Sequence, residues 1–193
     1  MIIWTVQPVS ALRDLETDGV FRCDRSQSFN LMKADTLERP YRWLIQRMTE
    51  KIGAPPAGVE YPIWAWHTWE FARRRPDTES AVFVRRTEEK VLFTLDVPEE
   101  ALVLSDFDAW QYVLMDSYVA DAVTEEEFDA LKERLEGLDG EELRVETERS
   151  WVNVFKTDPV NSELLIRGRY VQATFWEIRR EYVKDAKLLP VNA

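Results

Sequence analysis

Cysteine and histidine are almost absent from this chain of 193 residues, in which Cys23 is the only cysteine and His67 the only histidine. A single cysteine cannot close an intrachain disulfide, so a disulfide-stapled fold is excluded. Metal sites built from several cysteines and histidines are excluded for the same reason, and we expect no metal. A free thiol and the lack of a secretory leader pattern at residues 1–6 are typical of a cytoplasmic protein, which is the localisation we predict.

Glycine, proline and long apolar runs are also scarce. No run approaches the roughly 20 apolar residues that cross a bilayer, so we expect no membrane association. Six glycines and nine prolines are too few for a fibrous or low-complexity chain. The chain is instead 45% hydrophobic and 12% aromatic, and it is shorter than the roughly 250–300 residues at which cores divide. We therefore expect one globular domain over residues 1–193.

Basic residues are outnumbered, because 25 Lys and Arg stand against 36 Asp and Glu, a net charge of −11. Residues 121–148 contain 12 acidic and three basic residues, so this acidic segment carries −9 of that charge. A chain with no basic face is not expected to bind duplex nucleic acid. The acidic segment is interpreted as a solvated helical surface or as a surface that docks a protein partner, whose identity the sequence leaves open.

Hydrophobic periodicity indicates both strands and helices. Apolar or alternating runs at 2–6, 91–97 and 170–178 predict strands, and 81–85 is expected to form a hairpin with 91–97. Apolar residues spaced i, i+3, i+4 and i+7 within 41–52 predict an amphipathic helix. Strands and helices follow one another without a regular βαβ alternation. We therefore expect an α+β fold, with a mixed, mostly antiparallel sheet and flanking helices.

Tryptophan is abundant and arginine is clustered in the middle of the chain. Trp64 and Trp66 stand two residues apart, so on a strand they share one face and could hold a flat ring between them. Arg73, Arg74 and Arg75 follow closely, and guanidinium groups bind phosphate through paired hydrogen bonds. Together they predict a site for a nucleotide-like ligand. The alternatives are core packing for the tryptophans and a solvated loop for the arginines.

Candidate catalytic groups are few. Glu177 ends the apolar strand at 170–178, where a buried carboxylate would be expensive unless it is paired or functional. Gln172 lies earlier on the same strand and is a candidate ligand-binding residue, and His67 is the only side chain with an ordinary pKa near neutrality. Ser105 and Asp108 are interpreted as the N-cap and third position of a helix rather than as part of a catalytic or metal-binding pair of acids.

Four stretches together resemble one bacterial family, the domain-of-unknown-function family 3841. They are Ile3-Trp-Thr-Val-Gln7, Tyr61-Pro-Ile-Trp-Ala-Trp66, Leu104-Ser-Asp-Phe-Asp-Ala-Trp110 and Val171-Gln-Ala-Thr-Phe-Trp-Glu-Ile178. The resemblance runs from the first predicted strand to the last strong one. Family members tend to carry a histidine where this chain has Gln111. The family brings no established activity, but it implies that the aromatic stretches belong to one fold.

The opening of the chain, from Thr5 to Gly19, is also similar to that of ADP-ribosyltransferase-like proteins. That fold-level resemblance implies NAD as a substrate and the following roles: Thr5 and Gln7 border the nicotinamide, Trp64 and Trp66 stack near it, Arg73, Arg74 and Arg75 meet the phosphates, and Glu177 acts on the ribose. Two positions depart from the pattern. Trp4 stands where a histidine precedes the threonine, and Phe175 stands two residues before the acid.

Three functions follow from these features. The first is an ADP-ribosyltransferase-like enzyme that processes NAD or another nucleotide, with Glu177 and His67 as candidate catalytic residues. The second is a non-catalytic module that binds a nucleotide or a phosphorylated metabolite. The third is an interaction protein that uses the acidic segment. The enzyme requires Thr5, Trp64 and Glu177 to line a single cleft.

Overall fold

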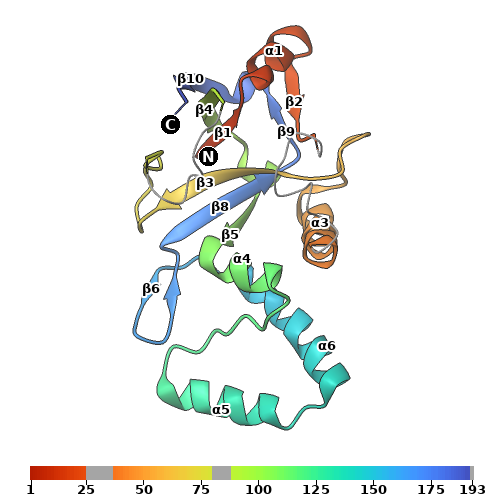
Figure 1. Ribbon diagram of the computed structural model, residues 1–193, viewed down its shortest axis with the longest axis vertical. Coiled ribbons are helices and arrows are strands. Elements are labelled where there is room, and N and C mark those ends of the chain that lie inside the picture. The colour runs from red at the N-terminus through yellow and green to blue at the C-terminus, as the bar shows by residue number, and fades with distance from the viewer. Residues whose placement is uncertain (25–36, 80–87, 192–193) are drawn as a thin grey trace.

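The computed structural model in Figure 1 describes residues 1–24, 37–79 and 88–191. The strands are β1 (Ile2–Pro8), β2 (Val20–Arg22), β3 (Ile63–Trp69), β4 (Lys90–Asp96), β5 (Val103–Asp106), β6 (Val160–Asn161), β7 (Ile166–Arg167), β8 (Tyr170–Phe175), β9 (Glu177–Arg179) and β10 (Val183–Leu189). The helices are α1 (Ser10–Thr17), α3 (Glu38–Ile52), α4 (Phe107–Leu114), α5 (Glu125–Glu136) and α6 (Gly140–Ser150), with the 3₁₀ helices η3 (Glu99–Ala101), η4 (Trp151–Phe155) and η5 (Arg180–Tyr182).

Six strands form one sheet in the order β10-β4-β1-β3-β8-β5, and every neighbouring pair in it is antiparallel. The predicted α+β class is therefore confirmed, and no parallel pair occurs among the strands that the structure describes. The predicted strand at 91–97 is β4, which pairs with β1 and β10. Its expected hairpin partner, 81–85, lies outside the described residues. The helix expected at 41–52 is α3, which Gly53 terminates with a positive φ.

The two faces of the sheet carry separate cores. Cross-strand partners share a face and successive residues alternate, so Ile3, Ala65 and Phe93 lie on one face. That face, named here the α1 face, packs against α1 and against the small β2–β9 sheet. The opposite face, named the α4 face, is covered at its β8–β5 end by α3, α4 and η4. Toward β10 no described helix covers the α4 face.

A β-bulge in β3 changes which side chains reach the α4 face. Trp66 is opposite Gln172 on β8 and Thr68 is opposite Val171, so His67 is an extra residue without a cross-strand partner. Regular alternation would turn Trp69 to the α1 face. The extra residue reverses that alternation, and Trp69, opposite Tyr170, lies on the same face as Trp66. The bulge was not predicted from the sequence.

Asp106, not Ser105, caps helix α4. Ser105 is the third residue of β5, and its side chain is fully buried. The carboxylate of Asp106 accepts hydrogen bonds from the backbone N–H groups of Ala109 (2.9 Å) and Gly168 (2.7 Å), so it joins the start of α4 to the turn before β8. Burial raises the pKa of Asp106, and these N–H groups and Arg167 oppose that rise because they favour the charged form.

The acidic segment folds into α5 and α6. Both helices begin with a capping box, formed by Thr124 and Glu127 in α5 and by Asp139 and Glu142 in α6. Within the described part of the chain, α5 buries none of its side chains. Figure 1 shows α5 beyond α4 and α6, at the end of the molecule away from the sheet. A search of the described helices finds none long and apolar enough to cross a membrane.

We predict that Gly168→Ala destabilises the protein far more than Gly58→Ala. Both glycines have positive φ, 72° and 81°, which costs an alanine about 1–2 kcal/mol. At Gly168 the added Cβ would also stand 2.7 Å from the carbonyl oxygen of Thr157, whereas at Gly58 it meets nothing within 4 Å. The free energy of unfolding in urea should fall by more than about 3 kcal/mol for Gly168→Ala. Equal losses for the two variants would contradict this packing.

Candidate functional site

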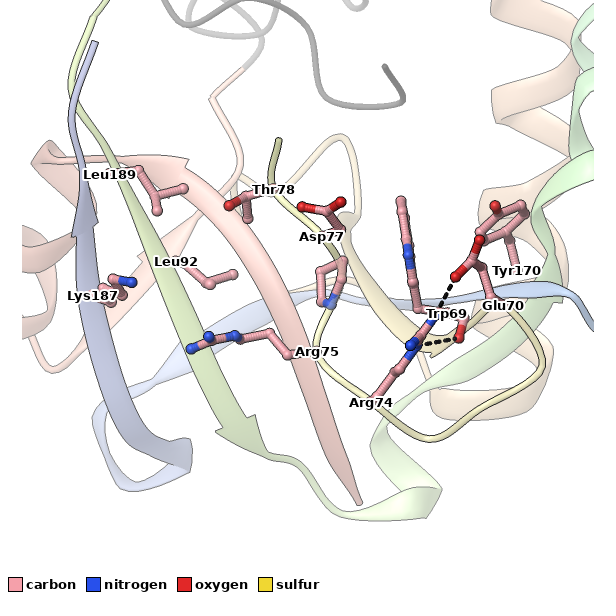
Figure 2. A pocket seen from close by; sticks show the side chains of 11 residues that line it. Trp69, Glu70, Arg74, Arg75, Asp77, Thr78, Leu92, Tyr170, Lys187 and Leu189 are labelled. Carbon is pink, nitrogen blue, oxygen red and sulfur yellow. Dashed lines mark hydrogen bonds and ion pairs between the residues drawn. The ribbon is translucent and has the colours of Figure 1, made fainter. Parts of the chain in front are cut away.

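A groove of about 700 Å³ lies over the α4 face of the sheet (Figure 2). It is lined by Trp69 and Tyr170 from β3 and β8, by Glu70, Arg74, Arg75, Pro76, Asp77 and Thr78 from the segment after β3, and by Leu92, Lys187 and Leu189 from β4 and β10. We name it the sheet groove. Its volume falls within the range of small-molecule sites in proteins.

A strained turn forms one end of the sheet groove. Glu70 and Phe71 both have positive φ, 50° and 60°, as a type I′ turn requires. Two hydrogen bonds between the backbones of Trp69 and Ala72 close the turn, and the Phe71 N–H donates to the carbonyl of Arg169 at 2.9 Å. Glycine and asparagine adopt this conformation at low cost, whereas Glu and Phe do not. Strain of this kind occurs preferentially at binding sites, where the surrounding structure maintains it.

The charges of the sheet groove are not balanced. Arg74 forms an ion pair with Glu70, and its Nε donates to the carbonyl of Trp69 at 3.2 Å. Among the described residues, neither Arg75 nor Lys187 forms an ion pair or a side-chain hydrogen bond, and both side chains are exposed. In Figure 2 the side chain of Arg75 extends toward Lys187. Even with the carboxylate of Asp77 in the lining, this part of the groove can receive an anion.

The other end of the sheet groove is aromatic. The rings of Trp69 and Tyr170 meet edge to face with centroids 4.9 Å apart, and Trp66 lies behind Trp69 at 5.0 Å. Trp69 is only 3% exposed, so the half-buried ring of Tyr170 is the more accessible surface. The guanidinium of Arg169 lies 5.1 Å from the centroid of the Tyr170 ring. The groove thus joins an aromatic wall to a cationic end.

The three predicted arginines have two different roles. Arg74 and Arg75 line the sheet groove, as a phosphate site would require. Arg73 does not line it, because its guanidinium donates to the carbonyls of His67 and Ile2. Arg73 therefore ties the segment after β3 back to the sheet. The sequence pattern alone could not separate a structural arginine from its two neighbours.

Trp64 and Trp66 share the α4 face, as predicted, but they do not enclose an open space. Trp64 packs against Trp110 with ring centroids 5.3 Å apart, and Trp66 packs against Phe107 at the same distance. The indole N–H of Trp64 lies near the hydroxyl of Tyr41, but within the described residues it has no acceptor with hydrogen-bond geometry. Burial raises the pKa of Tyr41 to about 12, and the nearby indole opposes that rise. Trp66 is buried, and Trp64 is partly buried against the core of the α4 face.

Thr5 and Gln7 belong to the opposite face of the sheet. The Thr5 hydroxyl donates to the carbonyl of Trp64 at 2.7 Å, and the Gln7 amide donates to Thr5 at the same distance. Because Thr5 lies on the α1 face and the Trp64 ring on the α4 face, the two side chains do not line one cleft. Gln172 is buried on the α4 face between Trp66 and Ser105.

Glu177 lies on β9, in the small sheet that β9 forms with β2. Its side chain is only 12% exposed, and both carboxylate oxygens are engaged, one by Arg22 at 3.0 Å and the other by Arg179 at 2.9 Å. A carboxylate between two arginines is well suited to an ion-pair role. The structure does not bring Glu177 together with Thr5 and Trp64 in one cavity, so the catalytic assignment of Glu177 stays a prediction.

His67 occupies the bulge of β3 and does not titrate near neutrality. Its Nδ1 is 2.9 Å from the hydroxyl of Thr68. Burial lowers the pKa of His67 to about 4, and the positive charges of Arg73 and the N-terminus act in the same direction. The ring is therefore neutral at pH 7 and a weak base. His67 was a candidate catalytic residue because a histidine ordinarily has a pKa near neutrality, and that reason does not hold in the folded protein.

Of the residues that line the sheet groove, only Arg74 and Arg75 were predicted as site residues. Trp69 and Tyr170 carry no signal of their own in an aromatic-rich sequence, and only the bulge brings Trp69 to the correct face. Lys187 lies on β10, and its position opposite Leu92 depends on the pairing of strands almost 100 residues apart. Pairings of this range cannot be read from local patterns.

The fold and the groove define an α+β protein that presents a polar, partly aromatic groove on the incompletely covered face of an antiparallel sheet. The family model described as domain of unknown function (DUF3841) matches residues 2–184. The chain belongs to this family, as its aromatic stretches indicated. Searches of curated proteins and of solved structures find no significant match, and the likeness to ADP-ribosyltransferases gains no support from them.

We predict that the imidazole of His67 titrates with a midpoint near pH 4 in the folded protein, because burial and two nearby positive charges disfavour the protonated ring. Below about pH 6.5, where a histidine in the unfolded chain takes up a proton, the free energy of unfolding should fall as the pH falls. Proton NMR can follow this directly, since the chain has one histidine. Urea-unfolded protein serves as the control, with a midpoint near 6.5. The same midpoint in folded protein would contradict the burial of the ring.

Proposed function

We propose that this protein binds a small phosphorylated molecule with a flat ring, such as a nucleotide, in the sheet groove. The observation that carries the proposal is that Arg75 and Lys187 line the same groove as Tyr170 and have no anionic partner among the described residues. In a chain of net charge −11, two unpaired cations beside one cavity require an explanation, and phosphate supplies one.

The chemistry of the two cations suits a phosphate group. Arginine binds two phosphate oxygens through a planar guanidinium, and lysine adds a compact point charge. The ring of Tyr170 offers a flat apolar surface to a base or a similar ring. Arg74 is less available, because Glu70 already pairs with it. The strained turn at Glu70 and Phe71 also favours a binding role for this end of the molecule.

The same features support binding rather than catalysis. Among the described residues, the lining of the sheet groove contains no histidine or cysteine. The alternative of an ADP-ribosyltransferase-like enzyme depends on Thr5, Trp64 and Glu177 acting together. Thr5 and Trp64 project from opposite faces of the sheet, so no specific observation favours that alternative.

We predict that a nucleoside diphosphate raises the melting temperature of the protein. A ligand at about 100 times its Kd adds about 2.7 kcal/mol to the free energy of unfolding, which corresponds to roughly 5–10 °C for a chain of this length. A thermal-shift panel should contain ADP, NAD, adenosine and pyrophosphate. ADP is expected to exceed both adenosine, which lacks the phosphates, and pyrophosphate, which lacks the ring.

Variants then test whether the sheet groove is responsible. Arg75→Ala and Lys187→Ala should each weaken ADP binding by roughly 10- to 100-fold, since a hydrogen bond to a charged group contributes about 1.5–3 kcal/mol. Arg13→Ala, which removes an exposed arginine of α1, is the matched control and should bind as the wild type does. A shift that survives both groove variants, or no shift with any phosphorylated ligand, would refute the proposal.

A further inference from the structure

One carboxylate in the lining of the sheet groove takes no part in the phosphate contact. Asp77 is exposed, and no lysine or arginine of the described residues forms an ion pair with it. Glu70, the other acidic residue of the described lining, is already neutralised by Arg74. An unpaired carboxylate repels a phosphate in the same cavity. Asp77 is therefore suited to a different part of a ligand, one that donates hydrogen bonds.

The chain around Asp77 holds its carboxylate in place. Pro76, the residue before it, is buried, and Arg73 ties the same segment to the sheet. The backbone N–H of Glu79 donates to Oδ1 of Asp77 at 3.0 Å, which is the local bond of an Asx turn. Within the described chain no donor occupies Oδ2. The carboxylate is thus oriented by the protein and retains the capacity to accept further hydrogen bonds.

The position of Asp77 matches the middle of a nucleotide. In Figure 2 its carboxylate stands between the cations Arg75 and Lys187 on one side and Tyr170 on the other. A ligand with phosphate at the cations and a flat ring at Tyr170 has its sugar in between. Ribose carries neighbouring 2′- and 3′-hydroxyls, which both donate hydrogen bonds, and a carboxylate accepts such bonds more strongly than a neutral group does.

We propose that the nucleotide site described above is selective for ribonucleotides, because Asp77 accepts hydrogen bonds from the 2′- and 3′-hydroxyls of the ribose. This selectivity rests on the proposed function, since it concerns the same groove. A 2′-deoxyribonucleotide brings one donor fewer to a carboxylate that loses water when the ligand binds, and a site built to bond a hydroxyl discriminates against the analogue that lacks it. Asp77 is then the residue that determines the class of sugar.

Calorimetric titration with ADP, 2′-deoxy-ADP and pyrophosphate tests this selectivity. The wild type should bind ADP roughly 10-fold more tightly than 2′-deoxy-ADP, as expected for one hydrogen bond to a charged group. The titrations contain EDTA, because a carboxylate beside a phosphate can also share a magnesium ion with it. A preference that persists in EDTA belongs to the sugar and not to a metal.

Asp77→Ala should change the affinities for two of these ligands in opposite directions. Binding of ADP should weaken by roughly 10-fold, because the ribose loses its acceptor. Binding of pyrophosphate should instead become tighter, because the variant removes a negative charge from the cavity. The affinities for ADP and 2′-deoxy-ADP should become nearly equal. A residue that only supported the fold of the segment would weaken all three ligands together.

The matched control is Asp185→Ala, which removes an exposed aspartate of β10 that is not part of the groove lining. This variant should keep the preference for ADP over 2′-deoxy-ADP and should not weaken ADP. Circular dichroism and melting temperatures verify that both variants stay folded, which is expected because both side chains are exposed.

The outcomes separate this selectivity from the nucleotide site itself. Equal affinities of the wild type for ADP and 2′-deoxy-ADP, or a preference that survives Asp77→Ala, would overturn the role of Asp77 and leave the nucleotide site standing. ADP that binds only when magnesium is added would overturn it too, because the carboxylate would then hold a metal. If ADP, 2′-deoxy-ADP and pyrophosphate all fail to bind under either condition, the proposed function is wrong and the selectivity is wrong with it.

Discussion

The β-bulge of β3 determines what the rest of this molecule can do. One extra residue, His67, reverses the alternation of side chains, so Trp69 joins Trp66 and Tyr170 on the same face of the sheet. The strand then ends in the turn at Glu70 and Phe71, and the chain runs back over the sheet with Arg74 and Arg75. Without the bulge, Trp69 would point to the α1 face, and the sheet groove would lose its aromatic wall. The same bulge surrounds His67 with protein and with positive charge, which lowers the pKa of its imidazole.

The two faces of the sheet are unequal because the chain supplies covering elements to them unequally. Helix α1 and the β2–β9 sheet cover the α1 face, where Thr5 and Gln7 satisfy their polar groups internally. On the α4 face the helices cover only the β8–β5 end. Polar side chains therefore line the remaining surface, and two of them are cations without partners in the described chain. The sheet groove, where we propose that a ligand binds, therefore lies on the α4 face, whereas Thr5 and Gln7 lie on the α1 face.

Much of the fold was predictable because it depends on local patterns. The α+β class, the helix that Gly53 ends, the capping box at Thr124 and the shared face of Trp64 and Trp66 all follow from periodicity or from capping chemistry. The site was less predictable, because it depends on strand pairing over long distances and on one inserted residue. Arg74 and Arg75 were identified by their charge, whereas Lys187 and Tyr170 become site residues only through the sheet register. Ser105 was wrongly predicted as a helix cap, because Asp106 is also a good cap and strand β5 continues to Asp106 before the helix begins.

A crystal structure of the protein grown with ADP would show whether phosphate binds in the sheet groove on the α4 face. We expect the diphosphate to lie within hydrogen-bonding distance of Arg75 and Lys187, with the adenine against Tyr170. A nucleotide found instead between Thr5 and Glu177, on the other side of the sheet, would contradict the account and revive the transferase-like alternative.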